Sequence, residues 1–221
     1  MAPARTADEA TTLQRGKPLA TIGLGVILVA IEFGLLLTDR WFEARALFAF
    51  EVAPAAALSW WRWLITPLTG SLLHGSLLHL VSNLVILVIF GPTMEDAIGR
   101  VRFFLLYLIG VYVGTYAEAA LQTEPGYLVG ASGGLAALLA GYVVLFGQRD
   151  ARPLFGLSAE TVRLLWYAAA WAALQGLLLL AMLKQPQQLA IICHIAGFWA
   201  GLALTAPLER LRFKSPSSPT T

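Results

Sequence analysis

The sequence predicts an all-α, polytopic membrane protein that folds as a bundle of six transmembrane helices. Its composition, its long apolar runs and the placement of its cationic residues all lead to this fold class. Apolar residues make up 58% of the 221 residues, charged residues only 13%, and the mean hydropathy is +0.72. A soluble domain carries roughly 25% charged residues. The bilayer is therefore expected to act as the solvent for most of the chain.

Long apolar runs recur along the chain. A helix needs roughly 17–25 predominantly apolar residues to cross the hydrocarbon core. Six segments meet this requirement: 19–37, 75–92, 103–120, 131–147, 164–183 and 188–207. No small-residue cleavage site follows the first run, which we interpret as a retained span. We expect a membrane domain over 19–207, with polar tails at 1–18 and 208–221.

The cationic residues are distributed unequally between the two sides of the predicted bundle. One side carries both tails and the connections after the second and fourth spans, with Arg5, Arg15, Lys17, Arg100, Arg102, Arg149, Arg152, Arg163, Arg210, Arg212 and Lys214. The other side carries Arg40, Arg45, Arg62 and Lys184. Cytoplasmic loops are enriched in Lys and Arg, so both termini are predicted to be cytoplasmic.

The connection between the first two spans is long and aromatic. It covers residues 39–73 and carries Trp41, Phe42, Phe48, Phe50, Trp60, Trp61 and Trp63. Because aromatic rings favour the headgroup level, we expect this outward-facing loop to lie partly in the membrane interface. Both an aromatic belt and a specific functional loop fit this pattern.

Four polar side chains are predicted to lie at a similar depth below the outer surface. At 1.5 Å per residue, Ser132 lies roughly 8 Å below Tyr127, and His194 lies roughly 9 Å into the sixth span. His79 and Asn83 are one helical turn apart on the second span, which also begins outside. Buried polar groups are costly in lipid and point to a shared interior or a wet cavity.

Small residues surround Ser132 and His194. GxxxG patterns occur at 130–134 and 197–201, and such patterns let helix backbones approach closely. If the fourth and sixth spans pack through them, Ser132 and His194 come level, and a neutral imidazole can then activate the hydroxyl. Taken singly, each residue also has a structural explanation, as a packing serine or a hydrogen-bonded histidine. The common depth of Ser132 and His194 favours a catalytic role for both residues.

Four motifs lie in order along the predicted spans: HGSLLHLVSN from His74, GPTMEDAIGR from Gly91, GASGG from Gly130 and HIAGFWAG from His194. Together they resemble the rhomboid family of intramembrane serine proteases. The resemblance covers about residues 60–205. GxSG alone is a weak signal, whereas the four motifs in this order are a strong one.

The resemblance implies a six-helix membrane endopeptidase that works with a serine–histidine dyad. It implies that Ser132 is the nucleophile and His194 its general base. It further implies that His79 and Asn83 donate to the oxyanion, together with the backbone N–H of Ser132. Such donors, held away from bulk water, stabilise a developing alkoxide by about 3–4 kcal/mol each.

Other residues are expected to support this site. Gly130, Gly133 and Gly197 are predicted to allow the close packing around the dyad. Glu95 resembles a loop-stabilising acceptor on the cytoplasmic side, and His74 is expected to donate in a loop or at a helix start. The expected partners are the lipid bilayer and transmembrane protein substrates, with no nucleic acid, cofactor or metal. The sequence leaves the oligomeric state open.

The chain departs from the family pattern at one position near the base. Many members carry an aromatic residue one helical turn after the serine, against which the histidine stacks, and here that position is Ala136. Phe198 or Trp199 could supply the missing bulk. No carboxylate is assigned to complete a triad, although Glu118 lies near the outer end of the third span and Glu124 in the loop that follows it. A dyad suffices where packing orients the histidine.

Three other functions fit the sequence less well than the protease. A zinc protease needs HExxH, but His74 and His79 are five residues apart and no glutamate follows either. A transporter could use Glu32 and Glu118 as intramembrane acids, but no inverted repeat is visible. A non-catalytic rhomboid-like binding or quality-control protein would typically lack the serine or the histidine. We expect the protease to reside in a bacterial inner membrane.

Overall fold

The computed structural model is a helix bundle with one small antiparallel sheet, and it describes residues 16–52, 59–122, 125–148, 150–182 and 190–213. Its helices are α2 (Leu19–Thr38), α3 (Trp41–Phe48), α4 (Trp60–Gly70), α5 (Leu77–Ile98), α6 (Arg100–Leu121), α7 (Ser132–Phe146), α8 (Ala159–Met182) and α9 (Ile191–Phe213). Strands β1 (Phe50–Val52) and β2 (Gly126–Leu128) pair with Phe50 opposite Leu128. Most of the predicted tails, residues 1–15 and 214–221, lies outside the described residues.

The long helices follow the predicted spans. α2, α5, α6 and residues 191–211 of α9 are long and apolar enough to cross a membrane, and α7 is a shorter apolar helix of 15 residues. Two helices continue six residues beyond the predicted ends: α5 runs through Pro92 to Ile98 instead of ending at residue 92, and α9 runs to Phe213 instead of ending at residue 207. Hydropathy marks the apolar part of a helix, whereas α5 ends only where Gly99 adopts a φ of +81°.

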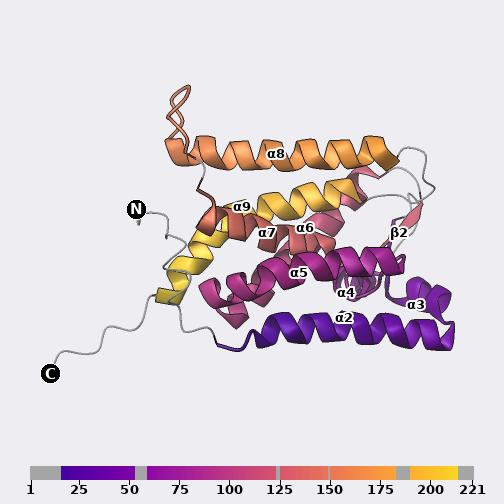
Figure 1. The fold of residues 1–221 in the computed structure, drawn as a ribbon. Helices are drawn as coiled ribbons and strands as arrows, with labels where there is room; N and C mark the ends of the chain where they lie inside the picture. Colours follow the sequence, from indigo (N-terminus) through magenta and orange to yellow (C-terminus); the bar gives the residue numbers. More distant parts are fainter. Residues whose placement is uncertain (1–15, 53–58, 123–124, 149, 183–189, 214–221) are drawn as a thin grey trace.

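The helices run side by side along one axis. α2 and α8 lie at opposite edges of the bundle in Figure 1, with α5, α6, α7 and α9 between them. α7 is central, because it packs against α5, α6 and α9. The start of α2 and the end of α9 lie at one end of the bundle, and α3 and β2 lie at the other (Figure 1).

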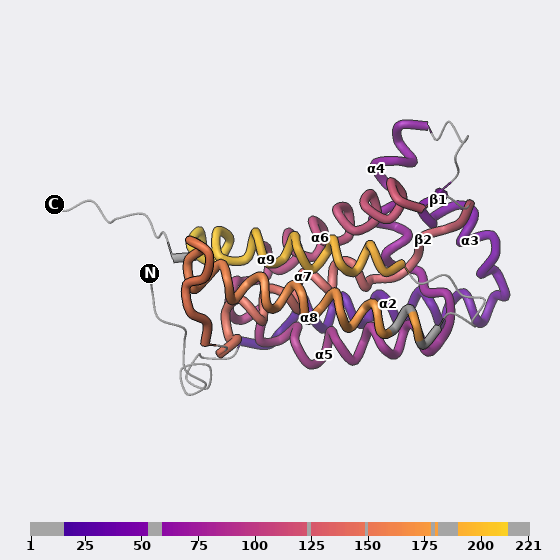
Figure 2. The backbone as a smooth tube through the Cα atoms, turned by 90° about the horizontal axis from the view of Figure 1, so that it is seen from above, coloured from indigo at the N-terminus to yellow at the C-terminus, as the bar shows by residue number. Residues whose placement is uncertain are grey.

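The segment predicted as an outer loop is instead largely folded, and this expectation was wrong in its secondary structure. It contains α3, β1 and α4, which lie together at one end of the bundle (Figure 2). Trp63 stacks on Tyr116 of α6 with ring centroids 5.4 Å apart, and Phe50 meets Trp63 edge-on at 5.3 Å. Phe42 and Trp60 remain exposed. Helices this short cannot be found from apolar runs of membrane-spanning length.

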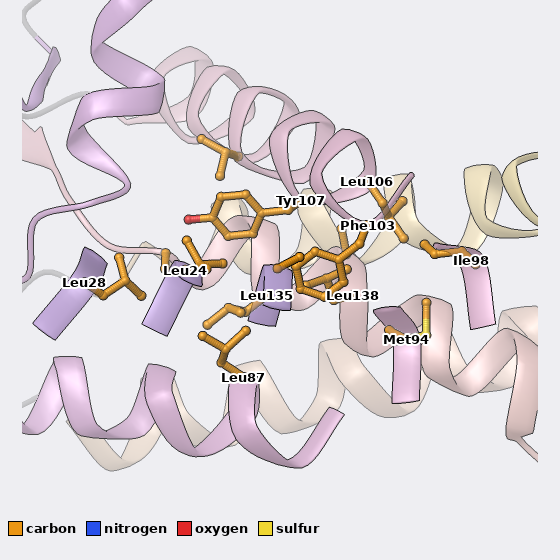
Figure 3. Close-up of a cluster of buried hydrophobic side chains, with 14 of the residues drawn as sticks. Leu24, Leu28, Leu87, Met94, Ile98, Phe103, Leu106, Tyr107, Leu135 and Leu138 are labelled. Carbon is orange, nitrogen blue, oxygen red and sulfur yellow. The ribbon is translucent and has the colours of Figure 1, made fainter. Parts of the chain in front are cut away.

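The apolar core joins α2, α5, α6 and α7. Figure 3 shows Leu24 of α2, Leu87 of α5, Tyr107 of α6 and Leu135 of α7 directed toward one another. Each is at most 4% exposed. The Tyr107 hydroxyl lies 3.4 Å from the hydroxyl of Ser71, at the turn after α4. The core therefore fixes the central helix, α7, from the side opposite α8.

Glycines set the separation of α6, α7 and α9. A methyl group at Gly197 of α9 would collide with the carbonyl oxygen of Gly133 on α7, and one at Gly201 would collide with that of Ala137. A methyl group at Gly110 of α6 would also come too close to the carbonyl oxygen of Gly133, at 2.7 Å. Backbones this close gain dispersion contacts that lipid cannot supply. The 197–201 pattern therefore lies in a helix interface.

The other GxxxG pattern, at 130–134, does not form a stripe on one helix. α7 begins at Ser132, so Gly130 precedes the helix, where it adopts a φ of +118°. Gly134 packs against Tyr107 of α6. The two glycines of the pattern therefore have different reasons. Gly130 is favoured because its φ is positive, and Gly134 is favoured because a larger side chain would not fit against α6.

Gly197→Ala is expected to destabilise the protein by about 1–3 kcal/mol, because the added methyl forces α9 away from the α7 backbone. The free energy of unfolding in detergent is the measurement. Gly23→Ala is the matched control, since no atom lies within 4 Å of a methyl group built there. Equal stability of the two variants would contradict the tight α7–α9 contact.

Glu95 connects α5 to the beginning of α2. Its carboxylate accepts the backbone N–H groups of Ala20 and Thr21, at 3.0 and 2.8 Å, and the Nε–H of Arg100 at 3.2 Å. The first N–H groups of a helix lack intrahelical partners, and a carboxylate there also interacts favourably with the helix dipole. Glu95 is an acceptor as expected: its bond to Arg100 spans the turn after α5, and it also caps the start of α2.

Candidate active site

The structure brings Ser132 and His194 together. The His194 Nε2 atom lies 2.8 Å from the Ser132 Oγ atom. Ser132 is the first residue of α7, and His194 is the fourth residue of α9. The two helices begin at the same end of the bundle (Figure 1). Their close packing through Gly133 and Gly197 thus sets the two side chains level.

The other ring nitrogen of His194 is also held. Its Nδ1 atom lies 2.9 Å from Oε1 of Gln175 on α8, and Gln175 is only 2% exposed. The indole N–H of Trp171, one turn earlier on α8, donates to the carbonyl oxygen of His194 at 3.2 Å. Gln175 was not among the residues expected here. Its signal in the sequence was a glutamine inside an apolar run.

The aromatic support expected for His194 is arranged differently. Trp199 is 49% exposed. Phe198 is buried, but it stacks on Trp171 with ring centroids 5.0 Å apart and 12° between the planes. Ala136 belongs to the same buried cluster as Phe198. The residues that hold His194 therefore come from α8, and the small Ala136 side chain fits beside the aromatic pair.

His79 and Asn83 lie one turn apart on α5, which packs against α7. Asn83 is 2% exposed, and its Nδ2 atom has no hydrogen-bond partner among the described residues. The His79 ring lies against Gly130, where an added methyl would come within 2.6 Å of Cε1. An unpaired buried amide costs free energy, so a donor free at this position needs an explanation.

Backbone contacts position the segment that leads into Ser132. The N–H of Gly130 donates to the carbonyl oxygen of Gly70, at the end of α4, at 3.0 Å. β2, just before it, pairs with β1. Ser132 itself occupies the N-terminus of α7, where N–H groups are free of intrahelical partners. Its backbone N–H is thus available to an anion at the site.

His74 is buried next to this site. Its ring meets the His79 ring edge-on at 5.2 Å, and neither of its ring nitrogens has a partner within the described chain. Burial, with a smaller contribution from His79, lowers the pKa of His74 to about 4 from its usual 6.5. The ring is therefore neutral at physiological pH. Across the described residues, no group of three or more His, Cys, Asp or Glu is placed to hold a metal ion.

The connections of His74 run through its backbone. Its N–H bonds to the carboxylate of Glu32, and its carbonyl oxygen accepts the indole N–H of Trp41 at 2.8 Å. The start of α5 is capped instead by Ser76, whose hydroxyl accepts the N–H of His79 at 3.2 Å. His74 is thus a loop donor and not a helix-start donor.

Glu118 anchors the start of α9. Its Oε2 atom accepts the backbone N–H of Cys193 at 2.9 Å, and the N–H of Ile192 contributes a second bond. The acid is 7% exposed. This contact fixes the first turn of α9, on which His194 lies, but Glu118 is committed to the backbone. The other acid considered for a triad, Glu124, lies outside the described residues.

Comparison with known proteins agrees with the motifs. Residues 57–210 match the family model of the Rhomboid domain. The chain is 33% identical to Rhomboid-related protein 2 of Mus musculus over 138 residues, which cover 60% of this chain and 44% of the mouse protein. It is 28% identical to Rhomboid protease GlpG of Pectobacterium atrosepticum over 196 residues, which cover 88% of this chain and 64% of that protein.

The matched regions span less than two thirds of either relative. The family match nevertheless covers most of this chain, and it includes Ser132, His194, His79, Asn83 and Gln175. The helices that carry these residues are apolar, and α5 and α9 are each long enough to cross a bilayer. This chain is therefore an integral membrane protein that belongs to the rhomboid family.

Proposed function

We propose that this protein is an intramembrane serine endopeptidase that hydrolyses peptide bonds in or near transmembrane segments of other membrane proteins. The observation that carries this proposal is the 2.8 Å contact between Ser132 Oγ and His194 Nε2. That contact joins a hydroxyl to a base near the ends of two helices, and the buried Asn83 amide on α5 has no partner for its Nδ2 atom among the described residues. Membership of the rhomboid family supports the same activity.

The dyad performs acyl transfer in two stages. His194 Nε2 takes the hydroxyl proton as Ser132 Oγ attacks the substrate carbonyl carbon, and a tetrahedral oxyanion forms. Collapse breaks the C–N bond, and His194 returns the proton to the leaving amine. Water then attacks the acyl-enzyme ester as His194 takes its proton, and collapse of this second intermediate breaks the bond to Ser132 Oγ. His194 gives the proton to Oγ, and the new carboxyl terminus is released.

The oxyanion is stabilised by three donors. They are the Asn83 side-chain amide, a ring N–H of His79 and the backbone N–H of Ser132 at the start of α7. Asn83 is buried, so its amide faces a region of low dielectric, where a hydrogen bond to a charged oxygen is strong. Its N–H₂ group has no partner within the described chain, which costs the free enzyme stability, and the oxyanion supplies that partner.

The substrate segment must unwind locally before it is cut. A helix hydrogen-bonds its own carbonyl oxygens to N–H groups four residues later, so an intact transmembrane helix does not offer its carbonyl to the donors. Substrates with helix-weakening Gly or Pro should therefore be preferred, and the family resemblance further implies a small residue before the cut.

We further propose six spans, formed by α2 and α5–α9, with both termini in the cytoplasm of a bacterium and the protein in its inner membrane. Lys17, Arg100 and Arg102 lie where α2 and α6 begin, and Arg210 lies near the end of α9, which fits the positive-inside rule. The only cysteine, Cys193, is buried. A cysteine introduced at Lys17 should therefore react with an impermeant maleimide only after cells are opened; reaction in intact cells would overturn this orientation.

The function is tested with purified protein in detergent and a model transmembrane substrate. We expect cleavage, and we expect a fluorophosphonate probe to modify Ser132, as located by mass spectrometry. Protein pre-treated with the probe is the matched control and should no longer cleave. Absence of both cleavage and labelling would favour a non-catalytic member of the family, and labelling of a different serine would overturn the assignment of Ser132.

A further inference from the structure

We propose that Gln175 is a positioning residue for His194 and completes a Ser–His–Gln arrangement in this chain. The inference rests on the proposed function, because it assigns a role within the same site. Gln175 comes from α8, whereas the dyad comes from α7 and α9. It therefore links the base to a third helix.

The contacts of the two His194 ring nitrogens indicate which of them carries the hydrogen. A neutral imidazole has one ring N–H and one free nitrogen lone pair. Because Oε1 of Gln175 is an acceptor, the Nδ1 atom that faces it at 2.9 Å must hold the hydrogen. The lone pair then lies on Nε2, which faces the Ser132 hydroxyl at 2.8 Å. This tautomer is the one that can accept the serine proton.

Among the described residues, Gln175 is the hydrogen-bond partner that selects this tautomer at Nδ1. In Ser–His–Asp enzymes a buried carboxylate bonded to Nδ1–H holds the ring in the productive tautomer and orientation. Here the nearby acid, Glu118, is bonded instead to the backbone N–H groups of Cys193 and Ile192. The glutamine amide supplies the same acceptor without adding a negative charge to the apolar interior.

Packing holds Gln175 rigidly enough for this role. Its side chain is 2% exposed. Trp171, one turn earlier on the same face of α8, bonds to the His194 carbonyl oxygen and stacks on Phe198, one turn after His194. Two residues of α8 thus clamp two residues of α9. These α8 residues hold His194 in place of the aromatic residue that many family members carry at the position of Ala136.

The kinetic test compares two substitutions of similar size. Gln175→Met removes the acceptor and should lower kcat about 10- to 100-fold with little change in KM, a loss typical of general acid–base positioning. Gln175→Glu keeps an acceptor and should retain at least a tenth of wild-type kcat. Leu177→Met, at a 64% exposed position on α8, is the control. A Met variant with wild-type kcat, or a Glu variant no better than the Met variant, would overturn the proposal.

A spectroscopic test is independent of catalysis. The chain contains only three histidines, so protein labelled with ¹⁵N-histidine gives three ring systems, of which His194 is identified by its loss in His194→Ala. We expect the Nδ1–H tautomer for His194 in the wild type and a mixed or reversed population in Gln175→Met. An unchanged tautomer would overturn the role of Gln175. Failure of wild-type cleavage would instead count against the protease function.

Discussion

Replacing His194 with alanine should lower kcat for cleavage of a transmembrane substrate by at least about 10⁴-fold, and Ser132→Ala should leave no measurable cleavage. A loss of this size is expected because a serine hydroxyl without a base in contact is a weak nucleophile. Because Ser132 and His194 act as one unit, removing either residue should cost about as much as removing both. The double variant should therefore be no worse than Ser132→Ala alone. The measurement is single-turnover cleavage by purified protein in detergent.

A control variant and a labelling measurement distinguish a loss of catalysis from a loss of folding. Trp199→Phe changes an exposed residue on the same helix as His194 and should cleave like the wild type. The rate of fluorophosphonate labelling should fall in His194→Ala, because the reagent requires an activated Ser132. Substantial cleavage by a folded His194→Ala protein would contradict its assignment as the base.

Asn83→Ala should lower kcat by about 10²–10³-fold while KM changes little. A donor that contacts the oxyanion acts in the transition state and not in the bound substrate, so its loss appears in kcat. Because the Nδ2 atom of Asn83 has no partner in the described chain, its removal breaks no observed bond of that amide in the free enzyme. Steady-state kinetics over a range of substrate concentrations measures the two constants.

Ser82→Ala is the matched control for Asn83. Ser82 is the preceding residue on α5, is exposed, and only donates to the carbonyl oxygen of His79 at 2.9 Å. Its substitution should leave kcat and the free energy of unfolding close to those of the wild type. If Asn83→Ala instead lost stability and substrate affinity in equal measure, Asn83 would be an interhelical hydrogen-bonding residue.

The sequence by itself determined the helical class and the order of the apolar runs. Crossing a bilayer requires a local property, an apolar stretch of sufficient length, and a local property can be read without knowing the fold. The glycine pattern at 197–201 likewise predicted a close helix contact, because only small residues permit one. Equal depth for Ser132 and His194 followed from the rise per residue, and the structure places these side chains in contact.

Only the tertiary structure decided which groups complete the site. Gln175 and His194 are 19 residues apart and come from different helices, and nothing in either apolar run fixes how the two helices rotate about their axes. Rotation depends on side-chain packing, here of Trp171 on Phe198. The same applies to Glu118, whose carboxylate meets α9 across 75 residues of sequence, and to the folded segment around α3 and α4. Apolar length places a side chain at a depth, whereas packing between helices decides what it contacts.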